Sequence, residues 1–284
     1  MATSDSSLHA PVRPARVLSI AGSDSGGGAG IQADLKTFSA LGCYGMTAIT
    51  ALTAQNTLGV SGIHAVPAAF VRAQIDAVVQ DIGVDAVKIG MLHTPDVVRV
   101  VADAIERHAL QRVVLDPVMV ATSGDRLVLQ ETVALMVRSL FPRVALVTPN
   151  LDEAAWLIGR PIKGASALDA AADALLALGA PAVLLKGGHL PGDEVVDLLA
   201  LADGTRQRFS APRIHSRNLH GTGCTLSSAI AAGLARGFAM PQAVAHAVDY
   251  VRQAIQASAD VRLGQGHGPL NHGFAPLPAY QQAV

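Results

Sequence analysis

Short apolar runs alternate with amphipathic stretches along the chain from Arg16 onward. The apolar runs have the length of buried strands, and the stretches between them repeat apolar residues every three to four positions, as helices do. This alternation predicts an α/β fold, with a mostly parallel central sheet and helices on both faces. The predicted parallel strands are Val17–Ala21, Ala86–Ile89, Val113–Leu115, Leu146–Thr148 and Val183–Lys186.

Proline, glycine and capping residues indicate where helices begin and end. Pro67 suits the first turn of a helix, and Thr94-Pro95-Asp96 is an N-cap signal for the next one. The apolar residues behind these signals share one helical face: Val71, Ile75, Val78 and Ile82 in the first helix, and Val97, Val101 and Ile105 in the second. Further helices are predicted over Ile31–Leu41, over Leu168–Leu178, around Leu226, Ile230 and Leu234, and around Val244, Val248, Val251 and Ile255.

The domain organisation predicted from this pattern is simple. Residues 1–15 mix small, polar and proline residues and are expected to be a disordered tail. Residues 16–284 are expected to form a single domain, because no linker-like stretch or internal repeat divides them. Val195–Leu201 and Gln207–Ser210 predict an antiparallel hairpin around Asp203-Gly204.

Composition excludes several classes of function. Charged residues make up 15% of the chain, the net charge is -1 and aromatic residues make up 4%, so neither electrostatics nor base stacking favours a nucleic acid as partner. No apolar run approaches the roughly 20 residues of a membrane span. Two cysteines, Cys43 and Cys224, do not form a disulfide framework, which favours a reduced, cytoplasmic location.

The first candidate loop runs from Gly22 to Gly30 and holds five glycines, which let a backbone approach a ligand closely. Gly28-Ala29-Gly30-Ile31-Gln32-Ala33 fits a dinucleotide fingerprint, but after Asp34 the next acidic residue is Asp76, so the ribose partner is missing. No Lys-Ser or Lys-Thr follows the glycines, so the loop is not a P-loop. A flexible turn remains the alternative to a ligand-binding loop.

The second candidate loop is His220-Gly221-Thr222-Gly223-Cys224, directly before a predicted helix. Its glycines leave backbone N–H groups unobstructed at the positive end of a helix, where a transferring phosphoryl group fits. Cys224 falls in the first turn, where the helix dipole is expected to lower the thiol pKa below its usual ~8.5. The alternative is an ordinary helix cap with a structural cysteine.

Three further polar positions follow predicted strands and should meet at one edge of the sheet. They are Asp116, Asn150 with Glu153, and Lys186. Carboxylates there can hold Mg²⁺ and a lysine can meet phosphates. Each position taken alone is as well explained by a helix cap or a turn.

Together these motifs resemble the hydroxymethylpyrimidine/phosphomethylpyrimidine kinases of thiamine synthesis, over about Val17 to Gly273. The similar blocks, in chain order, are Gly22-Ser23-Asp24, Gly27–Lys36, Thr50–Thr57, Lys88–Leu92, Leu115–Met119, Thr148–Asn150, Lys186–His189 and His220–Cys224. The resemblance implies a ribokinase-like fold, a homodimer, and ATP-dependent phosphorylation of 4-amino-5-hydroxymethyl-2-methylpyrimidine and then of its monophosphate, with Mg²⁺.

The resemblance also implies roles for single residues. Gln55 is expected to hydrogen-bond the pyrimidine, Met91 and Val118 to line its apolar faces, and Asp34 and Gly22 to lie near its polar edge. The Gly221–Cys224 turn, with Thr222 and Gly223, is the implied anion hole, and Cys224 takes the place of the catalytic acid–base residue. Lys186, Asn150 and Thr222 are the implied nucleotide contacts, and Asp116 and Glu153 the implied metal ligands.

The chain departs from the family pattern at three places. Asp24-Ser25-Gly26 stands where many relatives have Asp-Pro-Ser, Thr122 where a lysine is common, and Leu219 where a threonine is common. If the missing lysine neutralises phosphate in relatives, Lys186 must do more here. Two alternatives to the pyrimidine kinase stay open: a pyridoxine or pyridoxal kinase of the same fold, and a non-catalytic ligand-binding protein.

Overall fold

The computed structural model describes residues 12–119, 128–188 and 190–283. One eight-stranded sheet runs through its centre, with six parallel strands and an antiparallel edge formed by β10 and β11. In spatial order the strands are β11 (Arg206–Pro212), β10 (Glu194–Leu201), β9 (Ala182–Leu185), β8 (Leu146–Val147), β7 (Val113–Leu115), β6 (Ala86–Ile89), β2 (Arg16–Ala21) and β3 (Tyr44–Ile49).

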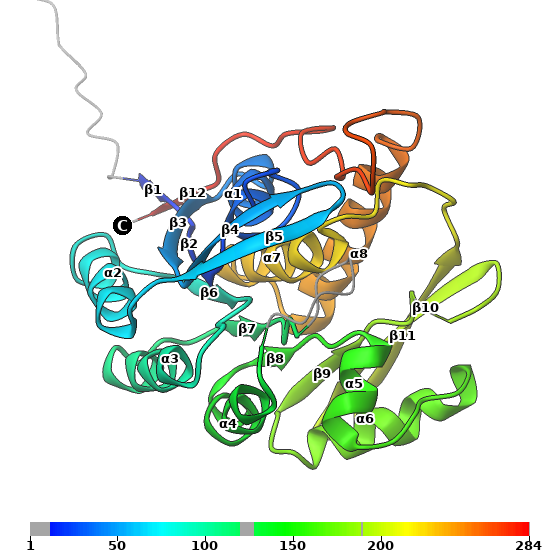
Figure 1. The fold of residues 1–284 in the computed structure, drawn as a ribbon, viewed down its shortest axis with the longest axis horizontal. Coiled ribbons are helices and arrows are strands. Elements are labelled where there is room, and N and C mark those ends of the chain that lie inside the picture. Colours follow the sequence, from blue (N-terminus) through cyan, green and yellow to red (C-terminus); the bar gives the residue numbers. More distant parts are fainter. Residues whose placement is uncertain (1–11, 120–127, 189, 284) are drawn as a thin grey trace, which may run out of the picture.

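Helices cover both faces of this sheet, as Figure 1 shows. One face carries α1 (Gly30–Ala40), α7 (Thr222–Ala235) and α8 (Met240–Gln256). The other face carries α2 (Ala68–Asp81), α3 (Pro95–Arg107), α4 (Gln130–Leu140), α5 (Leu151–Ile158) and α6 (Leu168–Leu176), with short 3₁₀ turns at Phe141–Arg143 and Ala165–Ala167. The predicted α/β fold with a mostly parallel sheet is confirmed.

Two small sheets lie outside the central one. β4 (Ala51–Asn56) and β5 (Gly59–Ala65) form an antiparallel hairpin, which crosses the front of the molecule in Figure 1. β1 (Val12–Pro14) pairs with β12 (Gln281–Ala283), so the two ends of the described chain lie together. No helix in the described ranges is long and apolar enough to cross a membrane.

The predicted boundary of the N-terminal tail is wrong at its C-terminal end. Residues 12–14 form β1 and Ala15 is fully buried, because the antiparallel partner β12 supplies backbone hydrogen bonds that a local reading of the sequence does not reveal. Residues 1–11 lie outside the described part. The single-domain organisation stays a prediction, which the continuous sheet supports.

Capping chemistry explains how two helices are placed on the sheet. The Thr94 side chain accepts a hydrogen bond from the Val97 N–H and begins α3, as predicted. Asn150 and Glu153 form a capping box at the start of α5, each side chain bonding the backbone N–H of the other. α5 therefore begins at the carboxyl end of β8, which brings Glu153 to the edge of the sheet.

Candidate active site

A cavity of about 840 Å³ opens at the carboxyl ends of the parallel strands. Open α/β sheets bind ligands at this edge. The cavity is lined by nearly all the residues that the sequence singled out, namely Gly22, Gln55, Met91, Asp116, Val118, Asn150, Glu153, Lys186, Gly221, Thr222, Gly223 and Cys224. Separate loops and strand ends thus converge on one space.

Asp34 is the exception among the predicted site residues. It is fully buried and does not line the cavity. Its carboxylate accepts hydrogen bonds from Lys88 Nζ at 2.8 and 2.9 Å and from Ser19 Oγ and Ser228 Oγ. These four bonds engage both oxygens, so the structure places Asp34 behind the cavity wall instead of at its surface.

The Lys88–Asp34 ion pair is a feature that the sequence analysis missed. Both side chains are 0% exposed, and Lys88 occupies the middle of a strand whose four residues are all buried. Burial alone would lower the pKa of Lys88, but the Asp34 carboxylate outweighs it and raises that pKa, so the lysine stays charged. A lysine inside a buried apolar strand was the available signal, because such a charge needs a buried partner.

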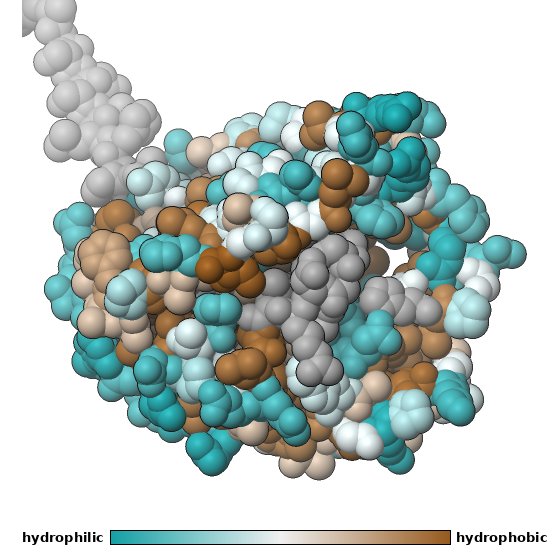
Figure 2. All heavy atoms as spheres, viewed as in Figure 1, coloured by the Kyte–Doolittle hydropathy of each residue, from teal (hydrophilic) through white to brown (hydrophobic). Residues whose placement is uncertain are grey.

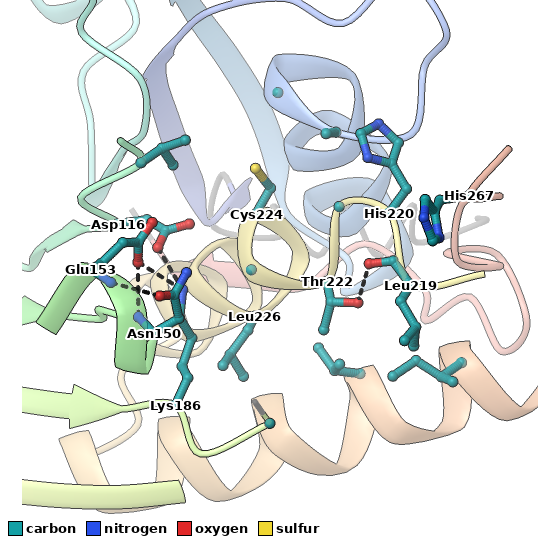
Figure 3. Close-up of a pocket in the computed structure, with 18 of the residues that line it drawn as sticks. Asp116, Asn150, Glu153, Lys186, Leu219, His220, Thr222, Cys224, Leu226 and His267 are labelled. Carbon is teal, nitrogen blue, oxygen red and sulfur yellow. Dashed lines mark hydrogen bonds and ion pairs between the residues drawn. The ribbon is translucent and has the colours of Figure 1, made fainter. Parts of the chain in front are cut away.

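One end of the cavity, which we call the anionic-ligand end, is formed by Asp116, Glu153 and Lys186 together with the Gly221–Cys224 turn (Figure 3). Lys186 Nζ lies 2.9 Å from Asp116 Oδ1 and 4.0 Å from Glu153 Oε2. Burial would lower the pKa of Lys186, but these two carboxylates outweigh it and raise the pKa. The predicted convergence of these strand ends is confirmed.

The Gly221–Cys224 turn begins α7 with exposed backbone donors. Gly221 is the N-cap and no side chain caps the helix. The Thr222 N–H donates to the Leu219 carbonyl at 3.2 Å, which leaves the N–H groups of Gly223 and Cys224 to bind an anion. Gly221 has φ +84°, and a Cβ there would lie 1.9 Å from the Gly28 carbonyl oxygen. A Cβ on Gly223 would lie 3.2 Å from Lys186 Nζ. Glycine is therefore required at position 221, against the first loop, whereas a side chain at position 223 would displace the Lys186 ammonium.

Cys224 differs from the sequence prediction. Burial raises the pKa of its thiol to about 11, although the nearby Lys88 ammonium opposes this rise. The expectation of a lowered pKa is wrong, because burial, followed by the carboxylates of Asp34 and Asp116, raises it. Cys224 is therefore a protonated thiol at neutral pH.

The opposite end of the cavity, which we call the ring end, is built from neutral groups. Gln55 projects from β4, and its Oε1 lies 3.1 Å from Thr53 Oγ1, whose proton is donated to the Ser23 carbonyl at 2.8 Å. Met91 and Val118 add apolar surface. A Cβ on Gly22 would lie 2.4 Å from Met91 Cε, so glycine is needed where the first loop passes this side chain.

The Asp24 carboxylate links the glycine-rich loop to His220, the residue directly before the Gly221–Cys224 turn. Its carboxylate accepts hydrogen bonds from the backbone N–H groups of Gly26, Gly28 and Ala29, and its Oδ2 lies 2.9 Å from His220 Nε2. Burial would raise the pKa of Asp24, but these bonds outweigh it and hold the pKa below its ordinary value. The glycine-rich loop is thus a fixed structure and not a flexible turn.

An apolar extension of the cavity lies between the antiparallel strands and α8. Phe209, Ile214, Val248, Val251 and Ile255 line it. Sequence reasoning assigned these residues only to strands and helices, because apolar core and apolar ligand contacts look alike in a sequence. Thr122 and His189, two positions named in the motif analysis, lie outside the described residues.

The chain was compared with known proteins. Residues 24–271 match the family model described as phosphomethylpyrimidine kinase. A hydroxymethylpyrimidine/phosphomethylpyrimidine kinase from Rhizobium meliloti (strain 1021) is 54% identical over 256 residues, which cover 90% of this chain and 96% of that protein. The "Thiamine biosynthesis bifunctional protein ThiED" of Geobacter sulfurreducens is 51% identical over 268 residues, which cover 94% of this chain and 54% of that protein.

A solved structure is similar over most of the chain. The crystal structure of an ADP complex of Bacillus subtilis pyridoxal kinase matches with a TM-score of 0.84 and 37% identity, covering 92% of this chain and 98% of that one.

Proposed function

The chain belongs to the phosphomethylpyrimidine kinase family, and we propose that it transfers the γ-phosphoryl group of ATP first to 4-amino-5-hydroxymethyl-2-methylpyrimidine and then to the resulting monophosphate, for thiamine diphosphate synthesis. The observation that carries this proposal is one continuous cavity with a neutral ring end and a charged anionic-ligand end. A heteroaromatic alcohol fits the first and the phosphates of a nucleotide fit the second.

The ring end binds the pyrimidine through one polar and several apolar contacts. The Gln55 carboxamide offers both a donor and an acceptor to the amino and ring nitrogens of the pyrimidine. Met91 and Val118 contact the faces of the ring, as the family resemblance implies. These contacts hold the hydroxymethyl group towards the Gly221–Cys224 turn, so that transfer becomes effectively unimolecular.

The anionic-ligand end binds the phosphates of ATP. The N–H groups of the Gly221–Cys224 turn and the Lys186 ammonium stabilise the charge that develops during transfer. Asn150 uses its Oδ1 to cap α5, so its NH₂ group is the part that contacts a phosphate. The apolar extension around Phe209 and Val251 accommodates the base of the nucleotide.

The residues present fit a Mg²⁺ ion bound together with ATP. Among the described residues no group of three metal-binding side chains occurs, but Mg²⁺ in kinases needs only one or two carboxylates, because phosphates and water supply the rest. Asp116 would be the better ligand, since its Oδ2 has only a 3.4 Å contact, from Ser227, within the described part of the chain. Glu153 accepts a hydrogen bond from the Asn150 backbone N–H with its Oε2, so it would be the weaker of the two ligands. The ion would neutralise charge on the phosphates.

Cys224 acts as the base of the first transfer in the small fraction of molecules that carry a thiolate. At neutral pH, about four pH units below the thiol pKa of about 11, this fraction is about 10⁻⁴. The second transfer needs no such base, because a phosphate monoester oxygen is ionised above about pH 6. The two reactions share the backbone N–H groups of the turn and differ in their need for the thiolate.

The direct test is ADP release with three alcohols supplied separately: the hydroxymethylpyrimidine, its monophosphate and pyridoxal. We expect turnover with both pyrimidines to exceed turnover with pyridoxal. Pyridoxal kinase is the second candidate, favoured by the similarity to the Bacillus subtilis structure. Turnover with pyridoxal alone would replace the main proposal by this candidate, and no turnover with any alcohol would favour a binding protein.

We further propose a homodimer, with a second copy packing against the β4–β5 hairpin and α2. Figure 2 shows hydrophobic residues on this face of the molecule, and Leu52, Leu58 and Phe70 are 47, 64 and 62% exposed. Apolar side chains exposed to this degree are typical of interfaces. Sedimentation should give the mass of a dimer, and Phe70→Glu should shift it towards the monomer. The cytoplasmic location stays a prediction.

A further inference from the structure

The β4–β5 hairpin contains an irregularity at the position of Gln55. The strands pair Ala54 with Gly62 but Gln55 with Val60, so the pairing shifts between these residues and Ser61 is left as the extra residue of a β-bulge. A bulge interrupts the ladder of backbone hydrogen bonds, and it re-aims the side chains beside it. The direction of the Gln55 side chain therefore depends on what fixes the backbone at this point.

A serine from the glycine-rich loop fixes it. Ser25 Oγ accepts a hydrogen bond from the Gln55 backbone N–H at 2.8 Å and donates one to the Gln55 carbonyl oxygen at 2.7 Å. One hydroxyl thus binds both polar groups of the same residue. Two bonds to one residue restrict the rotation of its backbone, and with it the direction in which the side chain leaves the strand.

The loop that carries Ser25 is itself held against β4. Ser23 N–H donates to the Ala51 carbonyl, and Thr53 Oγ1 donates to the Ser23 carbonyl at 2.8 Å. These bonds hold Ser23 directly against β4. A Cβ on Gly26 would lie 3.2 Å from the Asn56 Cα, so a side chain at this position would push the loop away from β4. The Ser25 hydroxyl is held in place by this packing and by Asp24.

We propose that Ser25 is a positioning residue, which sets the orientation of Gln55 and thereby the affinity for the pyrimidine. This inference rests on the proposed role of Gln55 in substrate binding. Ser25 contacts Gln55 only through the backbone, so it acts through Gln55 and does not itself touch the ring. The Gln55 carboxamide lies between Thr53 and His220, with its Oε1 3.1 Å from Thr53 Oγ1 and its Nε2 3.5 Å from His220 Nε2.

The chain offers a matched control for Ser25. Ser61 lies on the same hairpin and its exposed hydroxyl donates to a backbone carbonyl at 3.0 Å, but that carbonyl belongs to Ala54. Ser25→Ala should weaken pyrimidine binding, measured by calorimetry, by about three- to tenfold, the range expected for hydrogen bonds that water can partly replace. The kcat and the KM for ATP should stay within about twofold. Ser61→Ala should change pyrimidine affinity by less than about twofold, and Ser25→Thr, which keeps the hydroxyl, should restore it.

A double-mutant cycle with Gln55→Ala separates this inference from the proposed function. If Ser25 acts through the Gln55 side chain, Ser25→Ala should add no further loss of affinity once that side chain is absent. An equal loss in both backgrounds, or a loss no larger than that of Ser61→Ala, would overturn the role of Ser25 while leaving Gln55 in the site. Unchanged affinity in Gln55→Ala alone would overturn both.

Discussion

The two ends of the cavity are built in different ways. At the anionic-ligand end, Asp116 and Lys186 directly follow β7 and β9 of the central sheet, are nearly buried, and form an ion pair. At the ring end, Gln55 projects from a two-stranded hairpin outside that sheet, and its backbone is held by two hydrogen bonds with the neutral Ser25 hydroxyl. The charged end is thus fixed by the central sheet, whereas the ring end depends on contacts between the glycine-rich loop and the β4–β5 hairpin.

Removing the lysine should give the largest effect on the charged end. Lys186→Met leaves the Asp116 and Glu153 carboxyls buried without their cation and removes a charge from the phosphate site. We expect kcat to fall by about 10³-fold for both pyrimidine substrates alike. Steady-state kinetics with each substrate tests this, and Lys163→Met, at an exposed lysine, is the control. A loss confined to one substrate would contradict the assignment of Lys186 to the nucleotide phosphates.

Gly221→Ala should disrupt the contact between the Gly221–Cys224 turn and the glycine-rich loop. A Cβ at this position meets the Gly28 carbonyl at 1.9 Å, so the turn must move away from the glycine-rich loop. We expect kcat to fall by about 10²-fold or more, because the backbone donors lose their position. Gly159 has φ +70° and no atom within 4 Å of an added Cβ among the described residues. Gly159→Ala should therefore cost only about 1–2 kcal/mol of stability. If Gly159→Ala lost as much activity as Gly221→Ala, the loss at Gly221 would come from the positive φ and not from the contact with Gly28.

The pH profiles of the two transfers should differ. With a thiol pKa of about 11, the thiolate fraction of Cys224 rises about tenfold per pH unit below that value. The first transfer should therefore accelerate from pH 7 to 10, whereas the second should be nearly flat above about pH 7.

Cys224→Ala should flatten the profile of the first transfer and slow it by about 10²-fold at neutral pH, near the lower limit for a general base. The second transfer should slow less. Both steps can be measured separately if the monophosphate is supplied directly. Equal losses in the two steps would mean that the thiol acts on the geometry of the turn.

Asp24→Asn should give the smallest change in kinetics and a measurable change in stability. The amide cannot replace a carboxylate that accepts three backbone N–H groups and contacts His220, so we expect a loss of about 1–3 kcal/mol. The pKa of Asp24 is lowered in the folded protein, so its contribution is present above the unfolded value of about 3.9 and is lost as pH falls through the folded value. Denaturant unfolding should be measured at pH 7 and pH 3. The difference in the free energy of unfolding between variant and parent should be smaller at pH 3.

The position of the charged end could be predicted from the sequence because its residues follow parallel strands. Parallel strands end at one edge of a sheet, so Asp116 and Lys186 had to converge once their strands were recognised. Long-range effects were not predictable. The thiol pKa of Cys224 depends on burial and on Asp34, which lies 190 residues earlier in the chain, whereas the helix dipole is a local feature.

The ring end was harder to predict for a physical reason. β3, β4 and β5 are rich in glycine, alanine and threonine, and half or more of their residues are not buried, so they lack a clear apolar pattern. Gln55 entered the analysis only through the family resemblance. The hydroxyl of Ser25 and the carboxylate of Asp24 could not be assigned, because their partners are backbone groups that a sequence does not display.

The pairing of β1 with β12 has a consequence for how this enzyme can be joined to other proteins. β1 precedes the amino end of β2, whereas the cavity opens at the carboxyl ends of the strands, so both ends of the described chain lie on the side away from the substrates. A partner domain fused at either end would leave the mouth of the cavity free. The same proximity would let a short peptide link the two ends, with new termini opened at the exposed Asp203-Gly204 turn, in a circularly permuted kinase that keeps its sheet order.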